Sequence, residues 1–298
     1  MRFIQREHID CEKWDALVKS DASVSVFSLS AYLDAVAENW CVFTDEEYTK
    51  GIALPFTFRL GIKTCYTAVF LRYVEWIGEQ TVQFDKLISL LQAEFPGGQL
   101  CIKQAILGYP SEEFVFQHIP VLAERTINSQ AKRMLSKAEK KQFQLEEVDS
   151  IQDIQAIISE ELPQKIASIN DVSLSALEKL TSHLKNENRL RIVAIKDQSI
   201  TVGGLYLVDF NDTVLYLKGA FTKEAKDAGA MYFAMNEAIK QAQAAGKNFD
   251  FGGSRVEGVR RFNVNLGGND QVYFSYEWNN APFWFKLLKK ARQAWKRK

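Results

Sequence analysis

The segment that decides the fold covers residues 248–268 and reads NFDFGGSRVEGVRRFNVNLGG. Its first residues read as the end of a buried strand, and Gly252 and Gly253 follow at once. Glycine permits backbone torsions and close approaches that other residues do not. A strand that runs through such a turn into an arginine-bearing helix is one way to hold an anionic ligand beside a sheet. The alternative is a tight strand-to-helix connection with arginines on the surface.

The composition is that of a folded globular protein with room for two domains, since 47% of the 298 residues are hydrophobic and 25% are charged. No apolar run reaches the roughly 18 residues of a membrane span. The charged amino terminus, MRFIQREHID, is not that of a signal peptide, so export is not expected. A formal net charge of +0 argues against a protein that generally coats nucleic acid.

Cysteine and histidine usage predicts reduced thiols and no metal site. The four cysteines are scattered through the first half, at Cys11, Cys41, Cys65 and Cys101. This scatter indicates a cytoplasmic setting without a disulfide framework. The three histidines, His8, His118 and His183, have no cysteine or acidic partners at metal-ligand spacing.

Periodicity predicts a mixed sheet with helices packed on it. In the second half we expect helices at 148–161, 173–188, 227–245 and 256–263, and strands at 190–196, 200–210, 213–221, 248–251 and 271–278. The first half repeats this order loosely, with helices at 10–19, 30–39 and 81–94 and strands at 40–44, 50–58, 62–68, 72–77 and 99–103. A basic helix at 128–142, which carries Arg133, joins the two halves.

The tail at 281–298 contains FWFKLLKKARQAWKRK and has one aromatic face and one strongly basic face as a helix. Such a helix docks its aromatic face on the protein, or lies on anionic lipid at the inner face of the membrane. RNA contact is the third interpretation. The sequence leaves these alternatives open.

Three features together resemble the Fem-type branch of the GNAT-like acyltransferases, which includes the peptidoglycan-bridge aminoacyltransferases. They are NSQAKRMLSKAEKKQFQLEEV at 128–148, the three strands before the alanine-rich helix, and FDFGGSRVEGVRRFNVNLGG at 249–268. The resemblance implies an α/β (α+β) chain with two tandem GNAT-like domains, each a mixed twisted sheet flanked by helices. We expect these domains at 1–145 and 146–280, with the basic tail at 281–298.

The resemblance also implies that strands 213–221 and 248–251 splay apart around an acyl donor, either an acyl-CoA such as acetyl-CoA or an aminoacyl-tRNA. The phosphate-binding turn then lies at 223–230, with Lys226 and Gly229 at matching positions. Two residues depart from the family pattern. Met231 stands where glycine or alanine is usual, and Asn263 follows Phe262 where the bridge-forming enzymes have a lysine.

Acyl transfer to an amine needs a proton acceptor and donors for the tetrahedral oxyanion. Asp250 is the predicted base, with Glu257 as the alternative, and Asn263 is predicted to hydrogen-bond a carbonyl. For Asp250, a structural hydrogen bond to the following turn is an equally good interpretation. Tyr216 and Lys218 are expected to share one face of their strand. The remaining predicted binding residues are Arg133, Gly252, Gly253, Ser254, Arg255, Arg260, Arg261 and Phe262.

These expectations describe a cytoplasmic bacterial N-acyltransferase or aminoacyltransferase that acts on an amine, such as a cell-envelope precursor. A GNAT-fold protein that binds a ligand or partner without catalysis is the alternative. In that case Met231 and Asn263 would be relics of a lost site.

Overall fold

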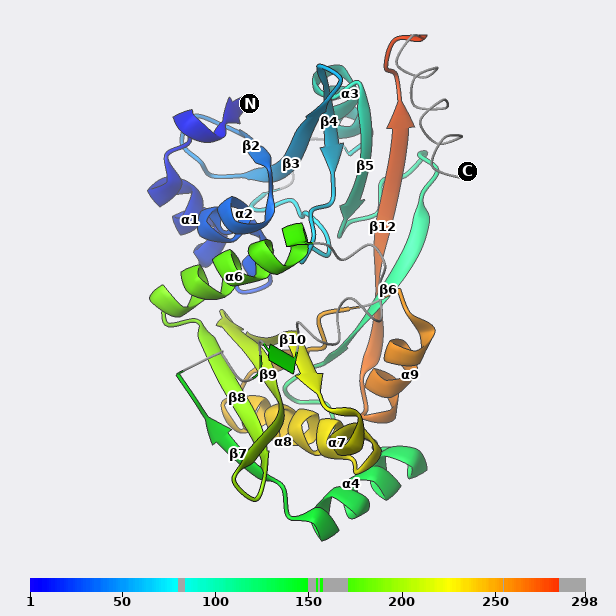
Figure 1. Ribbon diagram of the computed structural model, residues 1–298. Coiled ribbons are helices and arrows are strands. Elements are labelled where there is room, and N and C mark those ends of the chain that lie inside the picture. The colour runs from blue at the N-terminus through cyan, green and yellow to red at the C-terminus, as the bar shows by residue number, and fades with distance from the viewer. Residues whose placement is uncertain (80–83, 150–153, 155, 158–170, 254, 284–298) are drawn as a thin grey trace, which may run out of the picture. The chain divides into compact units, whose positions relative to one another are not determined.

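The computed structural model describes residues 1–79, 84–149, 154, 156–157, 171–253 and 255–283 (Figure 1). The tail beyond residue 283 and most of the predicted helix 148–161 lie outside these residues. The chain folds into two compact units. Unit 1 contains Met1–Asp21, Phe27–Phe114 and Tyr273–Lys298, and unit 2 contains Ala22–Val26 and Val115–Val272. The expected boundary at 145/146 differs from this division, because the 128–142 helix packs within unit 2.

Unit 1 is built on a mostly antiparallel sheet. Its strand order is β1-β2-β3-β4-β5-β12, in which only β4 and β5 pair in parallel. The strands are β1 (Arg2–Gln5), β2 (Asn39–Thr44), β3 (Gly51–Arg59), β4 (Ile62–Tyr66), β5 (Gly97–Ile102) and β12 (Asn269–Asn279). The helices are α1 (Cys11–Ser20), α2 (Ser30–Val36) and α3 (Phe84–Glu94).

The sequence interpretation of unit 1 needs two corrections. The predicted strand 72–77 forms only isolated bridges, from Val74 to Ile102 and from Ile77 to Gly51. Strand β1 was not predicted, because its four residues are too few to show a period. It nevertheless pairs with β2 along its whole length.

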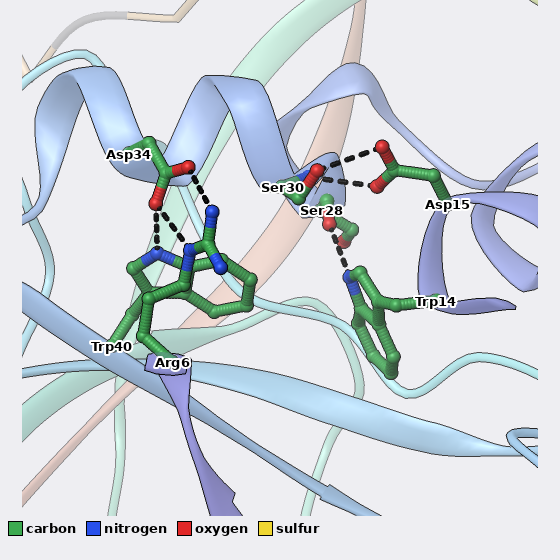
Figure 2. Close-up of polar contacts among 7 residues, drawn as sticks. All are labelled: Arg6, Trp14, Asp15, Ser28, Ser30, Asp34 and Trp40. Carbon is green, nitrogen blue, oxygen red and sulfur yellow. Dashed lines mark hydrogen bonds and ion pairs between the residues drawn. The ribbon is translucent and has the colours of Figure 1, made fainter. Parts of the chain in front are cut away.

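Two carboxylates hold helix α2 of unit 1 in place (Figure 2). Asp34 accepts hydrogen bonds from Arg6 Nε and Trp40 Nε1, both at 2.7 Å, and the Arg6 guanidinium lies 5.4 Å from the centre of the Trp40 ring. The hydrogen bond to Asp34 raises the pKa of Arg6. Asp15 accepts bonds from the backbone N–H and the hydroxyl of Ser30, which satisfies the start of α2. Helix α2 is therefore held at its first residue by α1 and through Asp34 by β2.

In unit 2 the strand order is β6-β11-β10-β9-β8-β7. Its strands are β6 (Glu112–Ile119), β7 (Gln144–Glu147), β8 (Leu190–Asp197), β9 (Ile200–Phe210), β10 (Thr213–Phe221) and β11 (Asn248–Asp250). Its helices are α4 (Ser129–Lys141), α6 (Asp171–Asn186), α7 (Lys223–Asp227), α8 (Ala230–Ala244) and α9 (Glu257–Asn265). Strands β10 and β11 pair in parallel and the other described pairs are antiparallel. The mixed sheet expected here is confirmed, whereas β6 and β7 were not predicted.

Helix α4 confirms the predicted helix at 128–142. Asn128 caps its first turn by accepting a bond from the Ala131 N–H at 2.9 Å. Gln142 ends it in the left-handed conformation, with φ of +55°. Ala131 and Ala138 are buried in the core of unit 2, where α4 packs on α8. The basic residues of α4 face outward.

The predicted helix 227–245 is observed as α8, which begins at Ala230 after Gly229, and the short helix α7 that precedes it was not predicted. Gly229 has φ of +92°, and a Cβ added to it would lie 2.3 Å from the Met134 carbonyl oxygen of α4. Because glycine has no side chain, α4 can approach the start of α8 at this position. Gly246, which ends the helix as predicted, has φ of +70°, and a Cβ added there would meet no heavy atom within 4 Å.

These two glycines give a matched test of the α4–α8 contact. Both Gly229→Ala and Gly246→Ala place a side chain in the left-handed region, which costs about 1–2 kcal/mol. Gly229→Ala adds an overlap with the Met134 carbonyl, so we expect a further loss of about 1–3 kcal/mol in the free energy of unfolding. Urea denaturation measures both, and equal losses would show that α4 does not constrain this position.

Candidate functional site

The pairing of β10 with β11 in unit 2 ends partway along β10. Their parallel register has three pairs and ends at Leu215 and Asp250, whereas β10 continues to Phe221. Gly252 still lies against β10, since a Cβ added to it would lie 2.3 Å from the Tyr216 carbonyl oxygen. Gly252 and Gly253 both have φ of +81°, which ends the extended path of the chain. We call this region, β10 from Tyr216 onward and the chain from Asp250 to Gly253, the fork.

A β-bulge in β10 lies at the same point. Tyr216 pairs with Leu207 of β9, and Lys218 pairs with Tyr206, so Leu217 is the extra residue. Adjacent residues of β9 point to opposite faces, and their partners do the same. Tyr216 therefore packs on the core with α8, whereas Lys218 lies on the other face beside Tyr206. The expectation that Tyr216 and Lys218 share a face was wrong, because the bulge reverses the alternation.

Two tyrosines flank the bulge on opposite faces of the sheet. Burial raises the pKa of the Tyr216 phenol and also that of the Tyr206 phenol. Tyr206 is 1% exposed. Both phenols therefore stay protonated at neutral pH, and the buried Tyr206 hydroxyl has no hydrogen-bond partner among the described residues.

Asp250 is the last residue of β11 and lies at the end of the fork where β10 and β11 still pair. It is 8% exposed, and its Oδ1 accepts a hydrogen bond from the Gly252 N–H at 2.8 Å. The structural interpretation of Asp250 as the residue that holds the following turn is thus confirmed. The catalytic role of Asp250 stays a prediction. The carboxylate shapes the fork because it fixes the first of the two glycines.

The predicted phosphate-binding turn 223–230 consists of α7 and the Gly229 cap of α8. The first turn of α8 has no side-chain cap, so its N–H groups are suited to an anion. Lys226 lies on α7, and burial lowers the pKa of its ammonium group. Gly229 is buried against α4, so its small size serves helix packing. These residues offer a phosphate a helix terminus and one cation, without the spaced glycines of the family pattern.

A chain of hydrogen bonds fixes α9 to the sheet of unit 2. Arg260 donates to Asp270 Oδ2 through Nη2 at 2.5 Å and through Nε at 3.1 Å. Gln117 of β6 donates to Asp270 Oδ1 at 2.7 Å and accepts from Asn263 Nδ2 at 2.9 Å. Asn263 is 2% exposed and Gln117 is fully buried. The Asn263 amide therefore points into the interior, and the Arg260 guanidinium is held by a carboxylate.

These contacts also set the charges of the network. The hydrogen bond from Arg260 holds the pKa of Asp270 below its usual range, and the same contact raises the pKa of Arg260. Sequence reasoning missed Gln117 and Asp270, since Gln117 and Asn263 are 146 residues apart. No local spacing could have indicated their contact. The binding role predicted for Arg260 stays a prediction, and an anion there would compete with Asp270.

The other predicted site residues lie on or near α9, apart from Arg133 on α4. Glu257 is exposed at the first position of α9, with Oε2 3.7 Å from Arg260 Nη1. Phe262 packs edge-on against Tyr232 of α8, with the ring centres 4.6 Å apart. Among the predicted binding residues, three arginines are exposed, namely Arg133, Arg255 and Arg261. Ser254 lies outside the described residues.

The described residues contain no group of three or more histidine, cysteine, aspartate or glutamate side chains that could hold a metal ion. Within the same residues, no helix has the length and apolar character that crossing a bilayer requires.

The interior position of Asn263 predicts a structural effect of its substitution. Asn263→Ala leaves Gln117 Oε1 buried without its donor, so we expect the free energy of unfolding to fall by about 1–3 kcal/mol. The neighbouring Val264 is 43% exposed, and Val264→Ala should change stability by no more than about 0.5 kcal/mol. Urea denaturation of both variants is the measurement. An Asn263→Ala protein as stable as the unsubstituted chain would mean that this amide does not bind Gln117.

Comparisons with known proteins support the fold described above. Residues 125–269 match the model of an acetyltransferase (GNAT) domain. A sequence search of curated proteins gives no match. The solved structure of FemX is similar with a TM-score of 0.67 at 14% identity, and the alignment covers 94% of this chain and 98% of FemX.

Two further solved structures are similar over most of the chain. L-PGS from Bacillus licheniformis gives a TM-score of 0.59 at 12% identity, with 95% of this chain and 96% of L-PGS covered. A protein of unknown function from Bacteroides thetaiotaomicron VPI-5482 gives 0.62 at 10% identity, with 90% and 97% covered. At these identities the likeness concerns the fold. The resemblance to the Fem-type branch is confirmed at that level, and the chain has a GNAT-like fold of the FemX type, with its GNAT domain at residues 125–269.

Proposed function

We propose that the chain is an N-acyltransferase, which transfers an acyl or aminoacyl group to an amine, and that the fork holds the donor. The observation that carries the proposal is the end of the β10–β11 pairing at Leu215 and Asp250, partway along β10. Within the described residues, no strand pairs with β10 on that side from Tyr216 to Phe221. The backbone groups of this edge are suited to binding an extended ligand.

The chemistry of acyl transfer fits the groups at the fork. A neutral amine attacks the donor carbonyl, and the oxyanion that forms requires preorganised hydrogen-bond donors. The bulge at Leu217 changes the direction of the backbone N–H groups of β10. In this proposal the donor carbonyl lies beside these groups. The buried Asp250 carboxylate attracts the acceptor amine while the amine is still protonated and cationic.

Two donor classes are compatible with the fork. An acyl-CoA is the donor that a GNAT domain suggests, and its pyrophosphate would lie at the first turn of α8 near Lys226. An aminoacyl-tRNA is the alternative, supported by the FemX-like fold and by the departure from the family pattern at Met231. The family resemblance favours an amine on a cell-envelope precursor as the acceptor.

A non-catalytic binding protein is the second candidate function. The observation in its favour is the position of Asn263, which lies where bridge-forming relatives carry a lysine and which is buried against Gln117. A binding protein would keep its ligand affinity without turnover. Measurement of binding and turnover on the same preparation separates the two functions.

Acetyl-CoA should raise the thermal midpoint of the chain if it is the donor, because a ligand that binds only the folded state stabilises it. The expected gain is about 2.7 kcal/mol at one hundred times the dissociation constant. Lys226→Glu places an anion near the proposed pyrophosphate position, so it should reduce this shift. Lys179→Glu makes the same charge change at an exposed position of α6, outside the proposed phosphate-binding turn, and serves as the control.

The outcomes of this titration discriminate between the donors. A saturable rise that Lys226→Glu weakens, and Lys179→Glu does not, supports acyl-CoA bound at α8. If millimolar acetyl-CoA leaves the midpoint unchanged, this donor is excluded. Aminoacyl-tRNA or a non-catalytic role would then remain.

A further inference from the structure

The hairpin of β3 and β4 in unit 1 ends in exposed apolar side chains. The pairing of the two strands extends to Arg59, and Leu60 and Gly61 form the two-residue loop that joins them. Phe58 is 58% exposed and Leu60 is 62% exposed, and Arg59 between them is exposed as well. We call these four consecutive residues the tip. It presents two large apolar side chains and one cation to solvent.

The backbone conformation of the tip makes its leucine unexpected. Leu60 and Gly61 have φ of +50° and +78°. A two-residue hairpin loop with positive φ at both positions favours Asn-Gly or Asp-Gly, because a bulky side chain is strained there. The two-residue loops of unit 2 place polar residues at their left-handed positions, Gln198 between β8 and β9 and Asn211 between β9 and β10. A strained leucine that stays mostly exposed indicates a contact outside the chain.

The tip lies at the same end of the unit 1 sheet as the carboxyl end of β12 (Figure 1). The register shows this directly, since Thr64 of β4 and Asn279 of β12 both pair with Gly97 of β5. Phe283 follows Asn279 by four residues and is 75% exposed. The exposed apolar side chains of the tip and the beginning of the basic tail therefore belong to one end of unit 1.

The charges at this end of unit 1 favour an anionic surface. Arg59 is exposed within the tip, and Lys63 forms an ion pair with Glu94, which neutralises that carboxylate. Two other exposed carboxylates, Glu38 and Glu277, lie further from the tip along the register. The basic tail, which begins at this end, contains seven lysines and arginines and no acidic residue. The sequence there supplies more cations than these carboxylates offset.

We propose that the tip inserts into the surface of an anionic lipid membrane, with Phe58 and Leu60 below the headgroups and Arg59 beside lipid phosphates. A stable protein interface buries about 800 Å² on each partner, whereas the tip is a narrow hairpin end with two apolar side chains. A lipid surface accepts such a protruding group, and its negative charge attracts the neighbouring cations. The contact is separate from any that the basic tail makes and requires no particular acyl donor.

Sedimentation of the full chain with vesicles tests the apolar part of the contact. The vesicles contain an equimolar mixture of phosphatidylglycerol and phosphatidylcholine. Leu60→Asn supplies the residue that this turn prefers, and Phe58→Thr keeps a residue suited to a strand, so the double variant should have an unchanged or higher thermal midpoint. Its partition coefficient should fall by about tenfold or more, because two apolar side chains no longer leave water. Ile200→Thr is the control, since Ile200 is 68% exposed on β9 of unit 2.

Charge reversal tests the electrostatic part of the contact. Arg59→Glu should weaken binding to the mixed vesicles by about fivefold or more, with little effect on vesicles of phosphatidylcholine alone.

Three outcomes overturn the proposal. The unsubstituted chain does not sediment with the mixed vesicles, or the double variant binds them as well as the unsubstituted chain, in which case another surface makes the contact. The third is that the double variant abolishes self-association, measured by light scattering, and leaves vesicle binding unchanged, which makes the tip an interface with a second copy. None of these measurements uses an acyl donor, so their result does not depend on the proposed function.

Discussion

The separation of β10 from β11 is the constraint on which the candidate site depends. Parallel pairing in the middle of a sheet normally continues along both strands, because each unpaired backbone group costs free energy. Here the bulge at Leu217 shifts the register of β10, and the left-handed Gly252 and Gly253 end the path of β11 at the same level. Asp250 fixes this geometry through the Gly252 N–H. The protein thus keeps a strand edge available for a ligand within the sheet of unit 2.

The helices around the fork are positioned by contacts that have no catalytic role of their own. The buried amides of Gln117 and Asn263 connect α9 to β6, and Asp270 holds Arg260 at the surface. At the start of α8, Gly229 lets α4 approach the first turn. Several residues that motif spacing assigned to ligand binding therefore contribute to the stability of the site. The candidate site itself is the edge of β10 from Tyr216 onward, next to Asp250.

The sequence predicted the long, strongly periodic elements well. Strands β9 and β10 have the predicted bounds, and α4 with its two capping residues covers the predicted range 128–142. Short elements such as β1 and β7 were missed because four residues show no reliable period. The bulge in β10 was also missed, since nothing near Leu217 marks it in the sequence. The pairing of His118 with Asp250 is a matter of strand register between distant segments, which composition and spacing do not contain.

Amide hydrogen exchange along β10 tests the donor site most directly, measured on the full chain with acetyl-CoA and then with an aminoacyl-tRNA. Backbone N–H groups that face the fork exchange through local opening in the free protein and are shielded when a ligand pairs with them. We predict that one of the two donors slows exchange within residues 216–221, with little change in β8. Binding of either donor that leaves this segment unprotected would contradict the assignment of the fork as the donor site.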